Sequence, residues 1–313
     1  MSASFKDLMQ ITVEAVQLSP HKTNKIAASL APADIGNLDN LITSTNYWPA
    51  LIEERIGTNT KIGNSSGTLH AETACLLKSS TAKSSSLYIT DPPCPNCAKN
   101  IAEAGIKNLY IDHKGFEKDF AQRRGDDFQN MSMRIFEAAG INVYEVHRKD
   151  NKIIPVLETA ADYVPLSEYP IQMFALETDF ATEIKAAKVH YGDEPFALCV
   201  AYNADYQPFI LHAQRHPTIG YTHHDDLSKE GKYSFILQPL NRLLMGSKFY
   251  GLLIDPEKIF SSRVPTSREL VNLVGANIQT LTIGDMKESR DEFGFKALEQ
   301  LSSNNIISHK HFS

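Results

Sequence analysis

The chain of 313 residues lacks any apolar run long enough to cross a bilayer, so we expect no membrane-embedded segment. Residues 1–20 contain no basic segment followed by an uninterrupted apolar core, and no secretory signal is therefore expected. Cysteine is also scarce, because four residues are too few for a disulfide scaffold in a chain of this length. With 42% hydrophobic and 22% charged residues, the sequence predicts a soluble, cytoplasmic, globular protein.

An excess of basic residues is absent as well, since the formal net charge is −6. Broad binding to nucleic acid depends on neutralising phosphates with Lys and Arg, so this charge disfavours a nucleic-acid partner. A basic segment does occur at Lys114–Arg124, but it also carries Glu117 and Asp119. Such mixed charge is more typical of a solvated surface than of a phosphate site.

The length favours two domains, each large enough to bury its own core. Ser4 and Asp7 form a possible capping box for an amphipathic first helix. Further along, helical and strand patterns alternate, with Pro and Gly at their boundaries, which predicts a layered α/β domain with parallel neighbouring strands. The expected helices are residues 69–78, 94–104 and 131–139, and the expected strands are residues 87–90, 108–112 and 141–146.

One spaced pattern contains most of the chemistry: His70 and Glu72, followed by Cys94 and Cys97. An imidazole and two thiolates are three of the four ligands that a tetrahedral zinc needs, which leaves one position for water. That is the stoichiometry of a catalytic site. A carboxylate two residues from the histidine is suitably placed to move protons. The predicted helix N-termini at His70 and Cys94 favour negative charge and hence the thiolate form.

A C-x-x-C motif alone also occurs in redox dithiols and in structural zinc sites. A redox pair, however, needs no upstream histidine and glutamate, and a structural site needs a fourth protein ligand. The spare thiols Cys75 and Cys199 lie in apolar segments and are expected in the core. His113 follows a strand and is expected to be a neutral loop residue, with a pocket-lining or fourth-ligand role as the alternative.

A second metal site is not expected elsewhere, because no cysteine or closely spaced carboxylates accompany the other group of histidines. The members of this group are His212, His216, His223 and His224.

The second half of the chain repeats the pattern of the first without its chemistry. A shift of 172 residues aligns Pro93, Asn100 and Ile111 with Pro265, Asn272 and Ile283. In this alignment, and at slightly smaller shifts upstream, the four motif residues His70, Glu72, Cys94 and Cys97 correspond to Leu237, Pro239, Thr266 and Glu269. The second copy cannot hold the same zinc, so we interpret it as a decayed duplicate; chance similarity between α/β layers is the alternative.

A polar segment and several prolines near residue 160 mark the junction between these halves. The expected organisation is therefore a catalytic zinc domain at residues 1–160 and a degenerate, zinc-free domain at residues 161–313.

The segments His70–Glu72, Pro93–Lys99 and Ala104–Ile106 resemble the zinc-dependent cytidine and deoxycytidylate deaminase superfamily, most closely its deoxycytidylate and tRNA adenosine deaminase branch. The resemblance covers roughly residues 20–146. It implies the three-layer cytidine deaminase-like fold, a mixed sheet with helices on both faces, here expected twice in tandem. It also implies Zn²⁺ as the cofactor and Glu72 as the catalytic proton shuttle.

The same resemblance implies substrate-binding roles before the histidine motif. The family places an asparagine at the end of an earlier strand, shortly before a proline, and Asn46 matches that layout. Trp48 is expected either to stack on a base or to anchor the structure, and the main chain of Ala71 to orient the base. No Cys/His set that could bind a second zinc occurs between Pro49 and His70, which is a departure from longer deoxycytidylate deaminases.

The expected reaction is hydrolytic deamination of a cytidine-type nucleoside or nucleotide such as deoxycytidylate. The alternatives are a nucleic-acid editing deaminase, acting on tRNA adenosine or single-stranded cytidine, and a deaminase of a free purine or pterin base. The chain is expected to be a monomer, as a pseudo-dimer of its two halves, or a homodimer.

Overall fold

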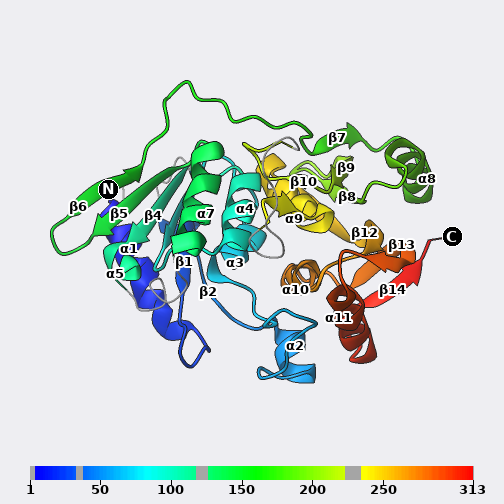
Figure 1. Cartoon of the computed structure of the whole chain (residues 1–313), viewed down its shortest axis with the longest axis horizontal. Helices are drawn as coiled ribbons and strands as arrows, with labels where there is room; N and C mark the ends of the chain where they lie inside the picture. The colour runs from blue at the N-terminus through cyan, green and yellow to red at the C-terminus, as the bar shows by residue number, and fades with distance from the viewer. Residues whose placement is uncertain (1–3, 33–37, 118–125, 223–233, 313) are drawn as a thin grey trace. The chain divides into compact units, whose positions relative to one another are not determined.

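A computed structural model describes residues 4–32, 38–117, 126–222 and 234–312 of the chain (Figure 1). The chain divides into two compact units that are discontinuous in sequence. Unit 1 comprises Met1–Tyr47, His70–Glu168 and Pro217–Ile236, and unit 2 comprises Trp48–Leu69, Tyr169–His216 and Leu237–Ser313. The boundary expected near residue 160 stays a prediction. It did not include the assignment of residues 48–69 to unit 2 or of residues 217–236 to unit 1.

Unit 1 contains a six-stranded mixed sheet in the order β2-β1-β3-β4-β5-β6. The pairs β1/β2, β1/β3 and β5/β6 are antiparallel, whereas β3/β4 and β4/β5 are parallel. The parallel neighbours are the strands for which the alternation of helix and strand predicted them. The strands are β1 (Ala27–Ala31), β2 (Ile42–Thr45), β3 (Ser86–Ile89), β4 (Asn108–Asp112), β5 (Asn142–His147) and β6 (Lys152–Leu157).

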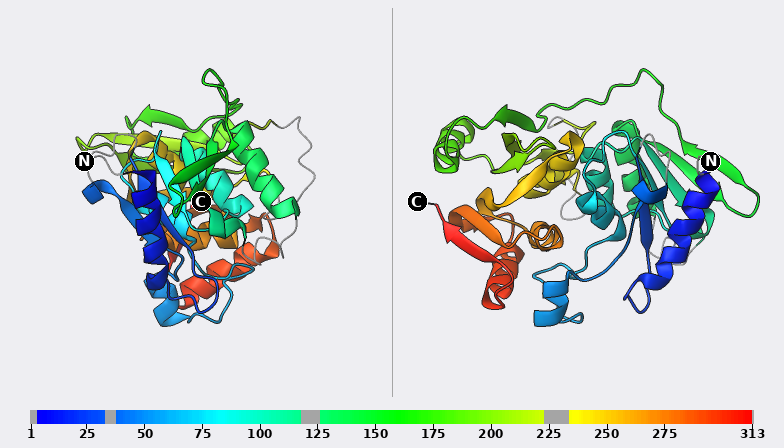
Figure 2. Two further views of the ribbon diagram at one scale, coloured as in Figure 1. Left: turned by 90° about the vertical axis from the view of Figure 1, so that its left-hand side faces the viewer. Right: turned by 180° about the vertical axis from the view of Figure 1, so that it is seen from behind.

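Helices cover both faces of this sheet. On one face, α1 (Phe5–Ala15) packs Leu8 and Met9 against Tyr88 and Val146. Three helices lie on the other face: α3 (Ala71–Lys78), α4 (Pro95–Glu103) and α7 (Asp126–Ala138). Figure 2 shows α1 alongside the strands, on the side away from these three helices. The unit is therefore a three-layer α/β structure.

The boundaries of these helices follow from local chemistry. Ser4 and Asp7 form the predicted capping box at the start of α1, in which each side chain accepts from the other residue's backbone N–H. The N-cap residues of α3 and α4 are His70 and Cys94, and a proline occupies the first position of α4. Both halves of the metal motif thus lie at helix starts, as predicted from the sequence.

Unit 2 contains a second six-stranded mixed sheet in the order β14-β13-β12-β8-β9-β7. The pairs β8/β9, β8/β12 and β7/β9 are antiparallel, and β12/β13 and β13/β14 are parallel. The strands are β7 (Gln172–Ala175), β8 (Phe196–Tyr202), β9 (Pro208–Gln214), β12 (Leu253–Val264), β13 (Thr280–Ser289) and β14 (Ser308–His311).

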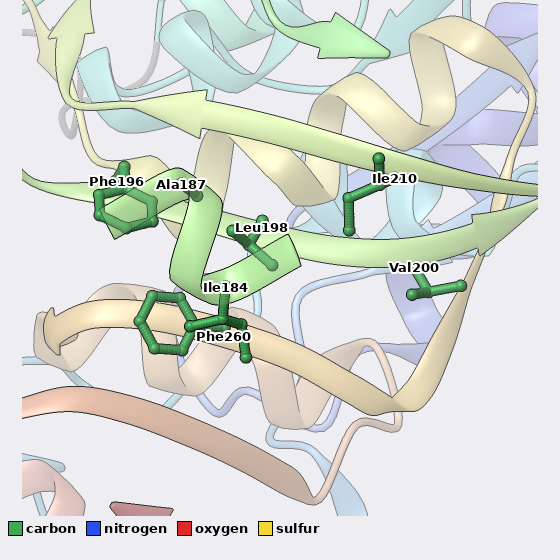
Figure 3. Packing of buried hydrophobic residues seen from close by; sticks show 7 residues of the cluster. All are labelled: Ile184, Ala187, Phe196, Leu198, Val200, Ile210 and Phe260. Carbon is green, nitrogen blue, oxygen red and sulfur yellow. The ribbon is translucent and has the colours of Figure 1, made fainter. Parts of the chain in front are cut away.

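As in unit 1, one helix covers one face of the sheet and three helices lie on the other face. Helix α8 (Phe180–Tyr191) packs Ile184 and Ala187 onto Phe196 and Leu198 of β8 and Phe260 of β12 (Figure 3). The residues of β8 that point to the other face of the sheet are also buried, because α9 packs against the strand there. The three helices of that layer are α9 (Pro239–Tyr250), α10 (Ser267–Gly275) and α11 (Glu292–Ser303).

The two sheets share the topology of five of their six strands. Strand order and direction in β2-β1-β3-β4-β5 are repeated in β9-β8-β12-β13-β14, with one helix before the first strand and three later helices in matching places. The units differ in the sixth strand, which pairs with β5 in unit 1 and with β9 in unit 2. The predicted α/β class with a mixed sheet is confirmed, and the repeated topology indicates a tandem duplication.

The remaining elements are short: α2 (Ala50–Arg55), α5 (His113–Phe116), the strands β10 (His216–Pro217) and β11 (Ile236–Leu237), and two 3₁₀ turns, Val16–Leu18 and Leu38–Asn40. Among the described residues, no helix has the length and apolar character needed to traverse a membrane. All four cysteines are free thiols.

Candidate metal centre

His70, Cys94 and Cys97 converge between the N-termini of α3 and α4. Their ligand atoms, one imidazole nitrogen and two sulfurs, all lie within 4.8 Å of one another. The Nδ1 atom of His70 is 3.2 Å from the Cys97 sulfur and 3.6 Å from the Cys94 sulfur. Tetrahedral zinc with ordinary Zn–N and Zn–S bonds separates such atoms by about 3.6 Å. Both the donor set and its spacing therefore fit zinc.

Glu72 lies two residues beyond His70, in the first turn of α3, and is only 3% exposed. Burial raises the pKa of its carboxyl to about 7, and the nearby Cys94 acts in the same direction while His70 opposes it. A buried carboxyl beside three potential metal ligands is costly for folding, because burial penalises its charged form. Its position is therefore more typical of a functional than of a structural residue.

The two thiols of the site change each other's pKa. A hydrogen bond from Cys97 holds the pKa of Cys94 well below its ordinary value, and the same hydrogen bond raises the pKa of Cys97. Next to them, the Thr73 hydroxyl lies 3.7 Å from the Cys97 sulfur and accepts a hydrogen bond from the Asn100 amide. Sequence reasoning missed Thr73 and Asn100, since polar helix residues carry no signal until the two helices are brought together.

Ala71 occupies the first position of α3, beside His70, and is fully buried. Its predicted main-chain contact with substrate stays a prediction.

Asn46 directly follows β2, as its predicted role requires, and is 7% exposed. Its amide oxygen accepts hydrogen bonds from the Ser19 hydroxyl and the Ile26 N–H, and its amide nitrogen donates to the Asn24 carbonyl. Asn46 therefore holds the segment 19–26 in place. Within the described residues, the second amide hydrogen makes no hydrogen bond and is available for the substrate contact that the resemblance implies.

The segment held by Asn46 contains His21, another residue that sequence reasoning missed. His21 is half-buried and lies close enough to His70 for their charges to interact; burial lowers the pKa of His21, and the charge of His70 lowers it further. Trp48, by contrast, begins the segment 48–69, which belongs to unit 2. Its expected stacking on a base stays a prediction.

Within the described part of the chain, His70, Cys94 and Cys97 form the only group of three or more potential metal ligands. His212 and His216 do not join such a group, and His223 and His224 lie outside the described residues. Cys75 and Cys199 are buried, which raises the pKa of both thiols. His113 lies beside Asp112 at the end of β4 and is not one of the grouped ligands.

The topological counterpart of this site in unit 2 has different chemistry. Thr266 caps α10 where Cys94 caps α4, and Glu269 is the third residue of α10 as Cys97 is of α4. One carboxylate oxygen of Glu269 accepts from the Thr266 N–H and hydroxyl, and the other accepts from the Leu240 N–H of α9. A carboxylate thus joins the same two helix N-termini.

One detail of the sequence alignment is wrong by a residue. The N-cap of α9 is Gln238 and its second residue is Leu240, so these match His70 and Glu72 in place of the expected Leu237 and Pro239. The loops that precede α3 and α9 differ in length. The alignment matched leucines inside the two helices, and such a match does not determine at which residue each helix begins. The conclusion that unit 2 lacks the ligands is unchanged.

Residues 53–113 match the family model of the cytidine and deoxycytidylate deaminase zinc-binding region. This part of the chain is therefore similar to the zinc-binding region of that superfamily. An uncharacterised deaminase from the luxG 3′ region of Aliivibrio fischeri is 36% identical over 77 residues, 24% of this chain and 50% of the relative. The deoxycytidylate deaminase of Enterobacteria phage T4 is 34% identical over 95 residues, 29% of this chain and 44% of the relative. The chain thus spans about half the length of these curated relatives.

Two solved structures of the dCMP deaminase from cyanophage S-TIM5 are also similar. The complex with dCMP and dUMP is 22% identical, with a TM-score of 0.31, over 44% of this chain and 93% of that chain. The apo form is 24% identical, with a TM-score of 0.33, over 47% and 100% of the two chains.

Proposed function

We propose that unit 1 is a hydrolytic deaminase that uses zinc held by His70, Cys94 and Cys97. The observation that carries the proposal is the convergence of these three ligand atoms within 4.8 Å, with the buried Glu72 on the same turn of helix. Three protein ligands leave a tetrahedral metal one position for water, which is the arrangement of catalytic zinc sites. The match to a deaminase zinc-binding region, which includes all four residues, supports the reaction class.

Each residue of the site has a separate role in the proposed reaction. Zinc, when bound, supplies a Lewis acid that makes water nucleophilic at neutral pH. Glu72 takes a proton from the attacking water and delivers protons to the ring nitrogen and to the departing amine. The products are ammonia and a ring carbonyl in place of the exocyclic amine. The Ala71 main chain and the free amide hydrogen of Asn46 orient the base.

We propose a cytidine-type nucleoside or nucleotide such as deoxycytidylate as the substrate. Support comes from the T4 relative, whose name is deoxycytidylate deaminase. The net charge of −6 disfavours the nucleic-acid alternative, since backbone binding depends on neutralising phosphates.

Ammonia release by the zinc-loaded full chain tests this proposal. The panel contains free bases, nucleosides, nucleoside monophosphates, and tRNA and single-stranded oligonucleotides. Release from cytidine or deoxycytidylate supports the proposal, and faster release from an oligonucleotide or a purine base would replace the substrate assignment. No release from any compound by fully zinc-loaded protein would contradict the deaminase function itself.

A further inference from the structure

Unit 2 has lost the metal ligands but contains a cavity of about 400 Å³ at the equivalent place. Its lining includes Gln238 and Thr266, the N-cap residues of α9 and α10, together with the ends of β12 and β13. In α/β sheets, ligands bind at the carboxyl ends of the parallel strands, where helices begin. The volume lies within the range of small-molecule sites.

Three arginines line this cavity, and they come from three different parts of the sheet. Arg215 follows β9, Arg263 belongs to β12 and Arg290 follows β13. Segments far apart in sequence thus bring three guanidinium groups to one cavity. Like charges repel one another, so such an arrangement is costly unless an anion compensates for it.

Two of these arginines already have carboxylate partners. Arg263 pairs with Glu288 at 2.7 Å, and Arg290 pairs with Asp291 at 2.6 Å. Arg215 differs from them: its guanidinium makes no hydrogen bond or ion pair with any residue that the structure describes, although the side chain is half-buried.

Arg215 lies in a lining of mixed charge, since Asp193, Glu194 and Glu269 line the cavity together with the three arginines. Burial lowers its pKa, and the charges of Arg290 and Arg263 act in the same direction, whereas Glu194 opposes them. Glu194 is exposed and does not form an ion pair with Arg215 within the described chain. The cavity therefore offers an unpaired guanidinium fork, the group best suited to bidentate contact with phosphate.

Glu269 also lines the cavity, but its carboxylate is fully engaged with the two helix N-termini. A ligand anion therefore cannot use these N–H groups, and the arginines are the positively charged groups in the lining that can bind it. We propose that the cavity of unit 2 is a binding site for a small phosphorylated molecule, with Arg215 as the principal phosphate contact and Arg290 and Arg263 as supporting charges.

Calorimetric titration of the full chain with inorganic phosphate and pyrophosphate, at low ionic strength, tests this inference. Arg215→Gln should weaken phosphate binding by roughly tenfold or more, because hydrogen bonds to charged groups contribute strongly. Arg290→Gln, at an exposed position where folding is not at risk, should weaken it by a smaller factor. Lys185→Gln removes the same charge from an exposed position of α8 and should leave binding unchanged.

The result that overturns the proposal is equally specific. Phosphate affinity that is equal in the wild type, Arg215→Gln and Arg290→Gln would place the anion elsewhere, including at the zinc site of unit 1. Absence of binding to both anions at millimolar concentration would show that the cavity is not a phosphate site. A circular dichroism spectrum that matches the wild type establishes that each variant is folded.

Discussion

The zinc site of unit 1 and its counterpart in unit 2 join the same two helix N-termini by different means. In unit 1, the side chains of His70, Cys94 and Cys97 gather around a position that suits a cation. In unit 2, the carboxylate of Glu269 accepts hydrogen bonds from the N-termini of both α9 and α10. Exposed helix N–H groups favour negative charge, which unit 1 provides through the Cys94 thiol, whose pKa is lowered, and unit 2 through the carboxylate of Glu269.

The scaffold around the two sites is also shared. In unit 1, the sixth residue of α4, Asn100, donates to the third residue of α3, Thr73; in unit 2, Asn272 of α10 donates to Asn241 of α9. The donor, its place in the helix and the acceptor's place are all the same. The difference between the units teaches that the fold depends on a bridge between the helices, whereas the chemistry depends on which residues form it.

The largest effect is expected at Glu72, the residue that separates a catalytic from a merely structural metal site. Glu72→Gln keeps the size of the side chain but removes the proton acceptor, so ammonia release should fall by about 10²- to 10⁴-fold. Metal analysis should show unchanged zinc. Glu103→Gln, at the buried far end of α4, is the matched control and should retain turnover. Turnover near the wild-type rate in Glu72→Gln would refute the assigned role.

A smaller effect is expected at Thr73, which contacts the Cys97 sulfur in unit 1 and has no metal-related counterpart in unit 2. Thr73→Val should weaken zinc binding by about tenfold or more, the usual cost of losing an outer-shell contact. Competition with a chromophoric chelator measures this. Thr12→Val, a buried change on the opposite face of the sheet, should leave zinc affinity unchanged. Equal affinity in both variants would remove Thr73 from the site.

Glu269 should behave in the opposite way to Glu72, because its carboxylate supports the fold of unit 2. Glu269→Gln replaces an acceptor oxygen by an amide that faces N–H donors, at a cost of about 1–3 kcal/mol in the free energy of unfolding. Urea denaturation measures this cost, and zinc content should not change. Glu292→Gln, an exposed change in the first turn of α11, serves as the control. An unchanged unfolding midpoint would contradict the bridging role.

The smallest effect concerns the shared hydrogen bond between helices. Asn272→Ala should destabilise unit 2 by about 0.5–1.5 kcal/mol, and Asn100→Ala should cost unit 1 a similar amount. The two changes differ in one respect, since only Asn100→Ala should also reduce zinc affinity, through Thr73. If both variants or neither altered zinc affinity, the proposed path from Asn100 to Cys97 would be incorrect.

Local patterns in the sequence predicted much of this molecule. The capping box at Ser4, the helix starts at His70 and Cys94, and β4 at Asn108–Asp112 all depend on neighbouring residues, and each was placed to within a residue or two. The spacing of the motif also predicted that its three ligands would meet.

Contacts between residues far apart in the sequence could not be predicted from local patterns. The amide of Asn46 holds a segment more than 20 residues upstream, and Glu269 bridges to Leu240, 29 residues away. The assignment of residues 48–69 to unit 2 and of residues 217–236 to unit 1 also depends on contacts between residues far apart in the sequence. These features depend on which helices and loops the fold brings together, and no local pattern records that.

Zinc content per chain tests the central comparison most directly. One equivalent is expected in the wild type, lost in Cys97→Ala and retained in Glu269→Ala, as measured by atomic emission on the purified chain. Two equivalents in the wild type, or one equivalent that survives Cys97→Ala, would contradict the assignment of a single zinc site to unit 1.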